Sequence, residues 1–319
     1  MFGSVISAVI LGVEAHRVMV EADVSSGLPG ISIVGCSSEQ GRGAQERVRT
    51  ALRNAGCLLP PRRITVNLAP AGLKKSGAGF DLPVAAALLI AAGCISSKSL
   101  EGILISGELS LDGQVRKVPG ILPMILLAKE LGCRGCIVPM ENSSEGKYVE
   151  QMNIIGIRHL TQLLTFCREG KIPEQAGENA AALPEEEMDF SDIRGQKLAK
   201  RGALAAAAGF HNLLMTGPPG SGKTMVARRI PGILPDLSGQ EKIEVMKIQS
   251  IAGLLTDGKI PGGRRPFRAP HHTLSLQALT GGGQIPRPGE MTLAHRGVLF
   301  TGGTTTRYCG RKNGAVKVA

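Results

Sequence analysis

The strongest constraint on the fold of this chain is a glycine-rich loop that matches the pattern G-x-x-x-x-G-K-[ST]. An apolar run at 213–215 precedes the loop, and a helical pattern at 225–230 follows it. A strand, loop and helix in this order direct backbone N–H groups and a helix N-terminus into one concavity, which favours a bound triphosphate. The flanking elements argue against the alternative, a chance match in a glycine-rich turn. The loop consists of Gly217, Pro218, Pro219, Gly220, Ser221, Gly222, Lys223 and Thr224.

Two residues of this loop carry specific expectations. We expect Lys223 to contact the β- and γ-phosphates of the nucleotide, and the Thr224 hydroxyl to bind Mg²⁺ that the nucleotide carries. The sequence therefore predicts nucleoside triphosphate binding. Hydrolysis is a separate question, because it needs further groups.

Length and composition predict a protein of about two domains, since the chain has 319 residues. Aromatic residues make up only 3% and tryptophan is absent, so aliphatic side chains must form the cores. No apolar run approaches the ~20 residues that cross a bilayer. Glu14 and His16 follow the first apolar run without a basic leader, so we expect no signal peptide, no membrane partner and a cytoplasmic protein.

The seven cysteines are scattered and odd in number, which is typical of reduced thiols. Cys133-x-x-Cys136 has the spacing of a metal or redox pair, but no second Cys or His pair lies nearby in the sequence. We therefore interpret the two residues as structural cysteines.

Charge is distributed unevenly along the chain. Residues 1–189 carry 18 Lys and Arg against 20 Asp and Glu, whereas residues 190–319 carry 19 against 6. This asymmetry favours a polyanionic partner for the second part. A basic surface for nucleic acid and a merely solvated basic surface both fit the charge alone.

The first 170 residues predict a mixed α/β domain. Strand patterns occur at 5–11, 18–22, 31–34 and 63–68, and Ser37-x-x-Gln40 has the pattern of a capping box that opens a helix ending near Gly56. We expect Asp81 to cap a very apolar helix at 82–92. Asp112-Gly113 predicts a hairpin turn between strands at 103–109 and 115–118.

Several segments of this domain resemble the bacterial magnesium-chelatase-like AAA+ family, which includes the ComM and YifB proteins. The segments that carry the resemblance are 28–35, 63–70, 80–83 and 107–113, and the likeness extends to about residue 300. The resemblance implies an N-terminal domain, residues 1–170, similar to the proteolytic domain of Lon protease and to the second domain of ribosomal protein S5. It implies an incomplete AAA+ P-loop domain after it.

The Lon-like fold raises a peptidase hypothesis, which needs a serine nucleophile and a lysine base in one site. The nucleophile position falls within 76–79, where we align Ala78, although Ser76 is close. The lysine position falls within 120–124, which contains no lysine. We therefore expect no peptidase activity and interpret the domain as a docking or assembly module.

Residues 171–188 are rich in Pro, Gly, Ala and Glu and predict a linker. The segment 189–196 then resembles the segment that AAA+ proteins place against the adenine of ATP, with Ile193 and Gly195 as candidate contacts. An alanine-rich helix is expected at 198–208, directly before the strand that leads into the loop.

Residues 256–290 are rich in loops and match a family insertion. We expect Arg264, Arg265 and Arg268 to face DNA in the pore of a hexameric ring, as the resemblance implies. A zinc site at His271-His272 is disfavoured, because adjacent side chains diverge and no third ligand has suitable spacing.

The family pattern breaks after Phe300, where the strand should end in the two Walker B acids. Thr301 follows instead, and no Asp or Glu occurs after Glu290. Mg²⁺ positioning and activation of water depend on such acids, so we expect binding without efficient hydrolysis. Residues 301–319, together with the missing sensor residues, arginine finger and lid, lead us to expect an aberrant tail from a shifted reading frame or a truncated product.

The partial AAA+ domain is thus expected to span 189–300. The resemblance implies ATP and Mg²⁺ as ligands, a homo-oligomeric ring and a family role as an ATP-driven motor on DNA, acting in branch migration during natural transformation. Two alternatives stay open: a magnesium-chelatase-type ATPase subunit that drives metal insertion into a porphyrin, and a non-catalytic nucleotide-binding assembly protein.

Overall fold

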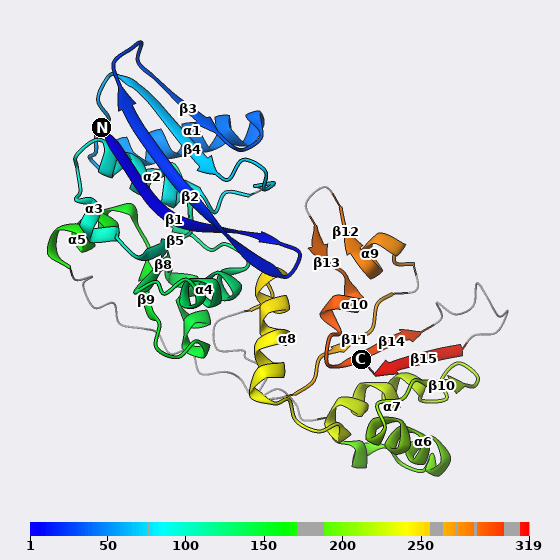
Figure 1. Ribbon diagram of the computed structural model, residues 1–319. Helices are drawn as coiled ribbons and strands as arrows, with labels where there is room; N and C mark the ends of the chain where they lie inside the picture. The colour runs from blue at the N-terminus through cyan, green and yellow to red at the C-terminus, as the bar shows by residue number, and fades with distance from the viewer. Residues whose placement is uncertain are drawn as a thin grey trace. The chain divides into compact units, whose positions relative to one another are not determined.

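The computed structural model describes residues 1–75, 77–170, 188–255, 264–271, 273–283, 286–302 and 313–318. The chain divides into two compact units, Met1–Ala180 and Ala181–Ala319 (Figure 1). Each unit has its own sheet, and both mix helices with strands, which confirms the predicted α/β class.

The first unit is built on a seven-stranded sheet with the order β3-β4-β2-β1-β5-β8-β9. Its centre is antiparallel from β4 through β2 to β1, and β5, β8 and β9 continue from β1 in parallel. The strands are β1 (Phe2–Leu11), β2 (Glu14–Ser25), β3 (Gly30–Val34), β4 (Arg63–Ala69), β5 (Ile103–Ile105), β8 (Gly135–Pro139) and β9 (Asn153–Ile157).

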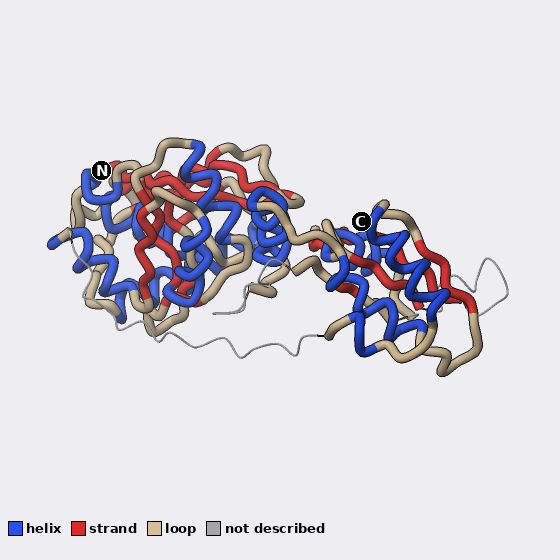
Figure 2. The backbone as a smooth tube through the Cα atoms, turned by 90° about the horizontal axis from the view of Figure 1, so that it is seen from below, coloured by secondary structure: helices blue, strands red, loops and turns tan. Residues whose placement is uncertain are grey.

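Helices cover both faces of this sheet (Figure 2). The helices are α1 (Ser38–Asn54), α2 (Asp81–Ala91), α3 (Ser97–Leu100), α4 (Ile121–Glu130), the 3₁₀ segment η1 (Met140–Tyr148) and α5 (Leu160–Glu169). Alternation along the strands separates the two faces. Ile103 and Ile105 join the core cluster around α1, α2 and α5, whereas Leu104 lies on the opposite face of β5.

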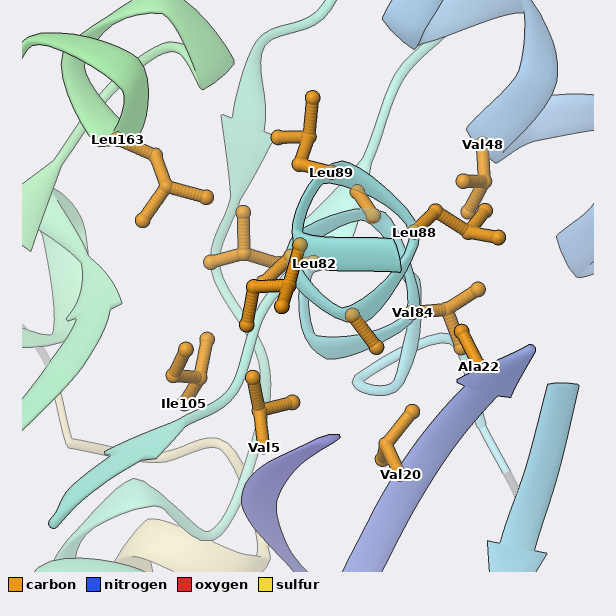
Figure 3. Packing of buried hydrophobic residues seen from close by; sticks show 14 of the residues in the cluster. Val5, Val20, Ala22, Val48, Leu82, Val84, Leu88, Leu89, Ile105 and Leu163 are labelled. Atoms are coloured by element: carbon orange, nitrogen blue, oxygen red, sulfur yellow. The ribbon is translucent and has the colours of Figure 1, made fainter. Parts of the chain in front are cut away.

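Helix α2 is the centre of this core, because all of its residues are buried. Figure 3 shows Leu82, Val84 and Leu88 of this helix among side chains from the strands and from α1. Burying one such leucine contributes roughly 1.5–3 kcal/mol, so the helix anchors the whole unit. The expectation that an all-apolar helix is central is confirmed.

Three local predictions were wrong. Ser37 precedes α1 but its side chain makes no capping hydrogen bond. Asp81 is the first residue of α2, not its cap, and it binds Arg47 instead. The strand expected at 103–109 is interrupted: β5 ends at Ile105, and a separate two-stranded ribbon pairs β6 (Glu108–Leu109) with β7 (Val115–Arg116).

The second unit has a four-stranded sheet with the order β10-β15-β14-β11. Helices α6 and α7 pack on it around a small apolar core. The sheet strands are β10 (Leu213–Thr216), β11 (Phe267–Arg268), β14 (Val298–Gly302) and β15 (Asn313–Val318). The other elements are η2 (Phe190–Asp192), α6 (Lys197–Ala208), α7 (Lys223–Arg229), η3 (Ile230–Ile233), α8 (Gly239–Ile251), α9 (Leu276–Thr280), α10 (Glu290–Leu293) and the ribbon of β12 (Gly281–Gly282) with β13 (Arg287–Pro288).

Strand β15 was not expected from the sequence. It lies between β10 and β14 and is antiparallel to both, which makes β10 and β14 parallel to each other. The residues after 300 therefore include a strand of the same sheet that carries the glycine-rich loop. Within the described residues, no helix combines the length and apolarity that crossing a membrane requires.

Candidate nucleotide-binding site

The glycine-rich loop connects the end of β10 to the start of α7, as the sequence predicts. Gly220 and Gly222 have φ angles of +80° and +86°, in the left-handed region that favours glycine. A Cβ atom added at Gly217 would approach the Ser221 hydroxyl to 3.0 Å. These glycines let the backbone curve tightly around the place where phosphates are expected.

Lys223 points back into this curve. Its ammonium group donates hydrogen bonds to the carbonyl oxygens of Gly217 and Pro218, both at 2.8 Å, and to the Ser221 hydroxyl at 3.1 Å. An ammonium group has three protons, so the loop itself satisfies all of them. Thr224 follows in the first turn of α7 and is exposed.

The structure separates the two residues expected at the adenine. Ile193 is only 1% exposed and packs in the core with Val226 and Ile230. Gly195 is exposed, with φ of +69°, and a Cβ atom added there would meet nothing within 4 Å. Of this pair, Gly195 is the residue that a ligand can approach.

Two contacts that the sequence analysis missed tie residues 189–196 to the loop and its helix. Arg229, in the last turn of α7, donates to the Asp189 carbonyl at 2.9 Å and to the Asp192 carboxylate at 3.1 Å. Gln196 donates to the Ser221 carbonyl at 3.4 Å. From the sequence alone, an arginine in the last turn of a helix is expected only to interact with the helix dipole. The pairing of Arg229 with residues about forty positions earlier could not be predicted in this way.

The three arginines predicted to face DNA occupy different environments. Arg265 is 7% exposed and donates to the carbonyls of Pro235 and Arg296 at 2.7 and 2.9 Å, while its guanidinium lies over the Phe210 ring. Arg268 forms a two-pronged ion pair with Glu290, with both distances 2.6 Å. Arg265 is therefore best explained as a structural residue, and Arg264 is the exposed member of the group.

The strand that should carry the Walker B acids is β14. Phe300 is buried in the core of the unit, and Thr301 follows it in the strand. The last acid in the sequence, Glu290, is held by Arg268. The position expected for the magnesium-binding carboxylate thus carries a hydroxyl side chain.

In the first unit, the loop expected to hold a peptidase nucleophile lies at residues 76–79, next to Lys75. Ser76 lies outside the described residues, and Ala78 is the residue aligned with the nucleophile. The nearby Lys75 is buried, and its ammonium donates to the carbonyls of Gly35, Pro70 and Leu73. Burial lowers the pKa of Lys75, but with all three protons donated the group does not act as a base in this arrangement.

Cys133 and Cys136 are free thiols, one half-buried and one buried. Burial raises the pKa of Cys136 to about 12, which keeps this thiol protonated and unreactive. Among the described residues, no group of three or more His, Cys, Asp or Glu side chains has metal-binding geometry. His272 lies outside the described residues, while His271 hydrogen-bonds Thr273.

Comparison with known proteins assigns the chain to a family. A family profile described as magnesium chelatase, subunit ChlI, matches residues 189–305, and a second, described as subunit ChlI of Mg-chelatase, matches residues 20–142. The chain belongs to the magnesium-chelatase-like AAA+ family. The first match includes the glycine-rich loop and runs into the segment after Phe300.

Individual members of this family are similar over most of the chain. Protein YifB of Escherichia coli is 42% identical over 290 residues, which is 91% of this chain and 57% of YifB. Competence protein ComM of Haemophilus influenzae is 42% identical over 304 residues, which is 93% of this chain and 59% of ComM. The chain therefore spans less than two thirds of the length of these relatives.

A shorter match supports the predicted Lon-like fold. Lon protease 2 of Bacillus subtilis is 29% identical over 124 residues, which is 39% of this chain and 22% of the protease. Together with the family matches, this likeness confirms the predicted fold class, a Lon-like α/β domain combined with an AAA+ P-loop domain.

Proposed function

We propose that this chain binds ATP with Mg²⁺ at the loop Gly217–Thr224 and hydrolyses it inefficiently. The observation that supports binding is the loop geometry: two left-handed glycines and a lysine whose ammonium group sits inside the curve. A bound phosphate oxygen would replace the loop carbonyls as the partner of Lys223, because an anion is a stronger acceptor than a neutral carbonyl.

The proposal of slow hydrolysis rests on the strand β14. Phosphoryl transfer depends on a metal held between the phosphates and on a carboxylate that orients the attacking water. The given sequence has no Asp or Glu side chain after Glu290, and Arg268 already binds that residue. Thr224 would be the principal side-chain ligand of Mg²⁺.

Calorimetric titration with ATP tests the binding proposal. We expect Lys223→Ala to weaken ATP binding by about tenfold or more, since charge-assisted bonds to phosphate are among the stronger hydrogen bonds. Lys242→Ala is a control, because Lys242 is exposed on α8 and lies outside the loop. Equal affinity of wild type and Lys223→Ala would contradict the proposed site.

We also propose DNA as a partner. Several acids of the second unit are occupied in ion pairs with arginines, while other cations stay exposed. Four of the acids there are paired with arginines: Asp192, Glu241, Glu244 and Glu290. Lys197 and Arg201 are exposed on α6 and make no ion pair within the described part of the chain. Some of the excess positive charge of this unit is therefore exposed, where a polyanion could contact it. A motor role on DNA in a hexameric ring extends this proposal to the longer family members.

Replacing surface cations tests the DNA proposal. We expect Lys197→Ala combined with Arg201→Ala to weaken binding of a duplex oligonucleotide and to reduce the slope of log K against log salt by about two, because each lost phosphate contact reduces that slope by roughly one. Arg264→Ala should act in the same direction. An unchanged slope would contradict DNA contact by α6. No DNA binding by the wild-type protein would instead favour the chelatase or assembly alternatives.

A further inference from the structure

Strand β3 forms one edge of the seven-stranded sheet, with β4 as its neighbour on the other side (Figure 1). The N–H of Gly30 donates to the Arg62 carbonyl, so Gly30 and every second residue after it direct their peptide groups toward β4. The peptide groups of Ile31 and Ile33 therefore point away from the sheet. Among the described residues, no hydrogen bond engages these groups.

The sequence of this edge does not discourage pairing with another chain. An open strand edge accepts an extended segment, and proteins usually protect it with charges, with proline or with a covering element. Strand β3 reads Gly-Ile-Ser-Ile-Val and contains neither charge nor proline. Helix α1 lies close to its far end, where a Cβ atom added at Gly41 would be 3.3 Å from the Ile33 carbonyl oxygen. We therefore place the pairing at the near end, around the peptide group of Ile31.

An apolar side chain is exposed next to this near end. Leu28 is 89% exposed, the highest fraction among the large hydrophobic residues that the structure describes. It lies in the turn between β2 and β3, where residues 26–30 are all exposed. A single exposed leucine is ordinary on a protein surface, so its significance depends on what surrounds it.

Two arginines lie beside this turn. Arg62 and Arg63 are exposed, and neither guanidinium has a hydrogen bond or an ion pair within the described chain. The side chain of Arg63 runs along the turn, because a Cβ atom added at Gly27 would meet three of its carbon atoms at 3.2 to 3.9 Å. Two unpaired cations are thus placed next to the exposed leucine.

The surroundings of the near end are positively charged. Arg62 and Arg63 are the only charged residues in the segments 24–38 and 55–71, which contain β3, β4 and the turns that precede them. On the neighbouring strand β2, Asp23 is already paired with the N-terminal amino group at 3.5 Å. Charge complementarity therefore favours an acidic partner at this end of the edge.

We propose that the edge of β3 binds an extended segment of a partner protein, in which apolar residues pack on Leu28 and acidic residues meet Arg62 and Arg63. The backbone of this segment exchanges hydrogen bonds with the peptide group of Ile31, as in the addition of a strand to a sheet. Its carboxylates form charge-assisted hydrogen bonds with the two guanidinium groups. The surface lies in the first unit and does not depend on the proposed nucleotide site.

The test starts from a phage-displayed library of random peptides of about ten residues, long enough to pair as one strand. Peptides are selected on the immobilised full chain in the absence of nucleotide. The most enriched peptide is synthesised with a fluorescent label, and its dissociation constants for the wild type and the variants are measured by fluorescence anisotropy. Thermal unfolding of each variant identifies any that fails to fold.

One pair of variants addresses the strand edge. Ile31→Pro removes the outward N–H and leaves the hydrogen bonds to β4 intact, since that N–H is not part of the ladder. Its control, Ile31→Val, keeps the N–H and a branched apolar side chain.

A second pair addresses the charge. Arg62→Glu combined with Arg63→Glu reverses the two cations beside the turn. Lys129→Glu combined with Lys147→Glu makes the same change in net charge at exposed lysines on α4 and η1, and is the matched control.

We expect the enriched peptides to combine Asp or Glu with β-branched residues. Ile31→Pro and the double arginine variant should each weaken binding of the selected peptide by about tenfold or more, because each removes a direct contact. Both controls should change it by less than about twofold. If Ile31→Pro does not fold, the double arginine variant gives the comparison alone, since both of its substitutions are at exposed positions.

Selection of no peptide would overturn the proposal, and so would peptides that bind both test variants as tightly as the wild type. A wild-type dimer in analytical ultracentrifugation that Ile31→Pro dissociates would assign the edge to a second copy of this chain. Binding to phosphatidylglycerol vesicles that the double arginine variant loses would assign the surface to lipid. Either of these results would also overturn the proposed partner segment.

Discussion

At the scale of single residues, the clearest departure from sequence expectations is Asp81. Its side chain is 1% exposed and accepts two hydrogen bonds from Arg47, at 2.7 and 2.9 Å, and one from the Leu109 N–H at 3.3 Å. Sequence patterns place an acid at a helix start because caps are common there. They contain no information about an arginine on another helix, so the ion pair could not be predicted.

The titration of Asp81 gives a pH prediction. Burial raises the pKa of its carboxyl group above 3.8, and the bonds from Arg47 offset this only in part. The folded state therefore keeps a proton on Asp81 at pH values where the unfolded state releases it. The stabilisation that Asp81 gives the folded state is complete below about pH 3.8 and is lost as pH rises through the folded pKa. The unfolding free energy of the wild type relative to Asp81→Asn should therefore decrease with rising pH across this window. Denaturant titrations of both proteins check it, and an increase would contradict it.

At the scale of elements, the loop between β10 and α7 was predicted from the sequence with both flanks in the right order. This was possible because the constraint is local: glycine supplies the turns and apolar residues supply the strand. Strand β15 pairs with the nearby β14 and with β10, a strand about a hundred residues earlier, and this second pairing could not be predicted from a local pattern. Turn-rich composition says nothing about such long-range pairing.

Three of the cysteines follow helices in the same local pattern, which can be read from the sequence. Helices α1, α2 and α4 are each followed by a left-handed glycine and then a cysteine: Gly56-Cys57, Gly93-Cys94 and Gly132-Cys133. In each case the cysteine N–H bonds to a carbonyl in the last helical turn, at 2.9 Å. This is the position after a helix that favours an apolar residue. It supports the structural interpretation of Cys133.

We predict a steric effect at Gly297, where the chain enters β14 beside the residue that precedes β11. Gly297 precedes β14, and a Cβ atom added there would lie 2.1 Å from the Pro266 carbonyl oxygen, which also accepts a hydrogen bond from Val298. Gly297→Ala must shift the backbone, so we expect a loss of about 2 kcal/mol or more in unfolding free energy. Gly239→Ala is the control, since nothing lies within 4 Å of its added Cβ. Comparable stability of the two variants in chemical denaturation would contradict the prediction.

At the scale of the whole molecule, the chain combines a Lon-like unit with a unit that matches the magnesium-chelatase family profile. Family membership and fold class could be predicted because several separated motifs agree in type and order. The roles of Arg265 and Ile193 could not, because burial depends on the packing of distant segments. Arg265 was expected at a DNA surface and lies in the interior of its unit.

The structure shows which cations of the basic second unit are exposed and which are paired with acids. Arginines of the second unit are paired with its few acids, and exposed cations such as Lys197 and Arg201 remain on α6. We therefore place the proposed nucleic-acid surface on α6, the helix that follows residues 189–196. Partner recognition and nucleotide binding would then use neighbouring elements of one unit.

The most direct test of the central claim measures ATP binding and ATP turnover side by side on the same preparation. We predict saturable ATP binding that Lys223→Ala weakens, with phosphate release that is little above the Lys223→Ala background. Release clearly above that background, abolished by Lys223→Ala, would contradict the view that the loop is half of a catalytic site. Absence of saturable binding by the wild type would contradict the nucleotide site altogether.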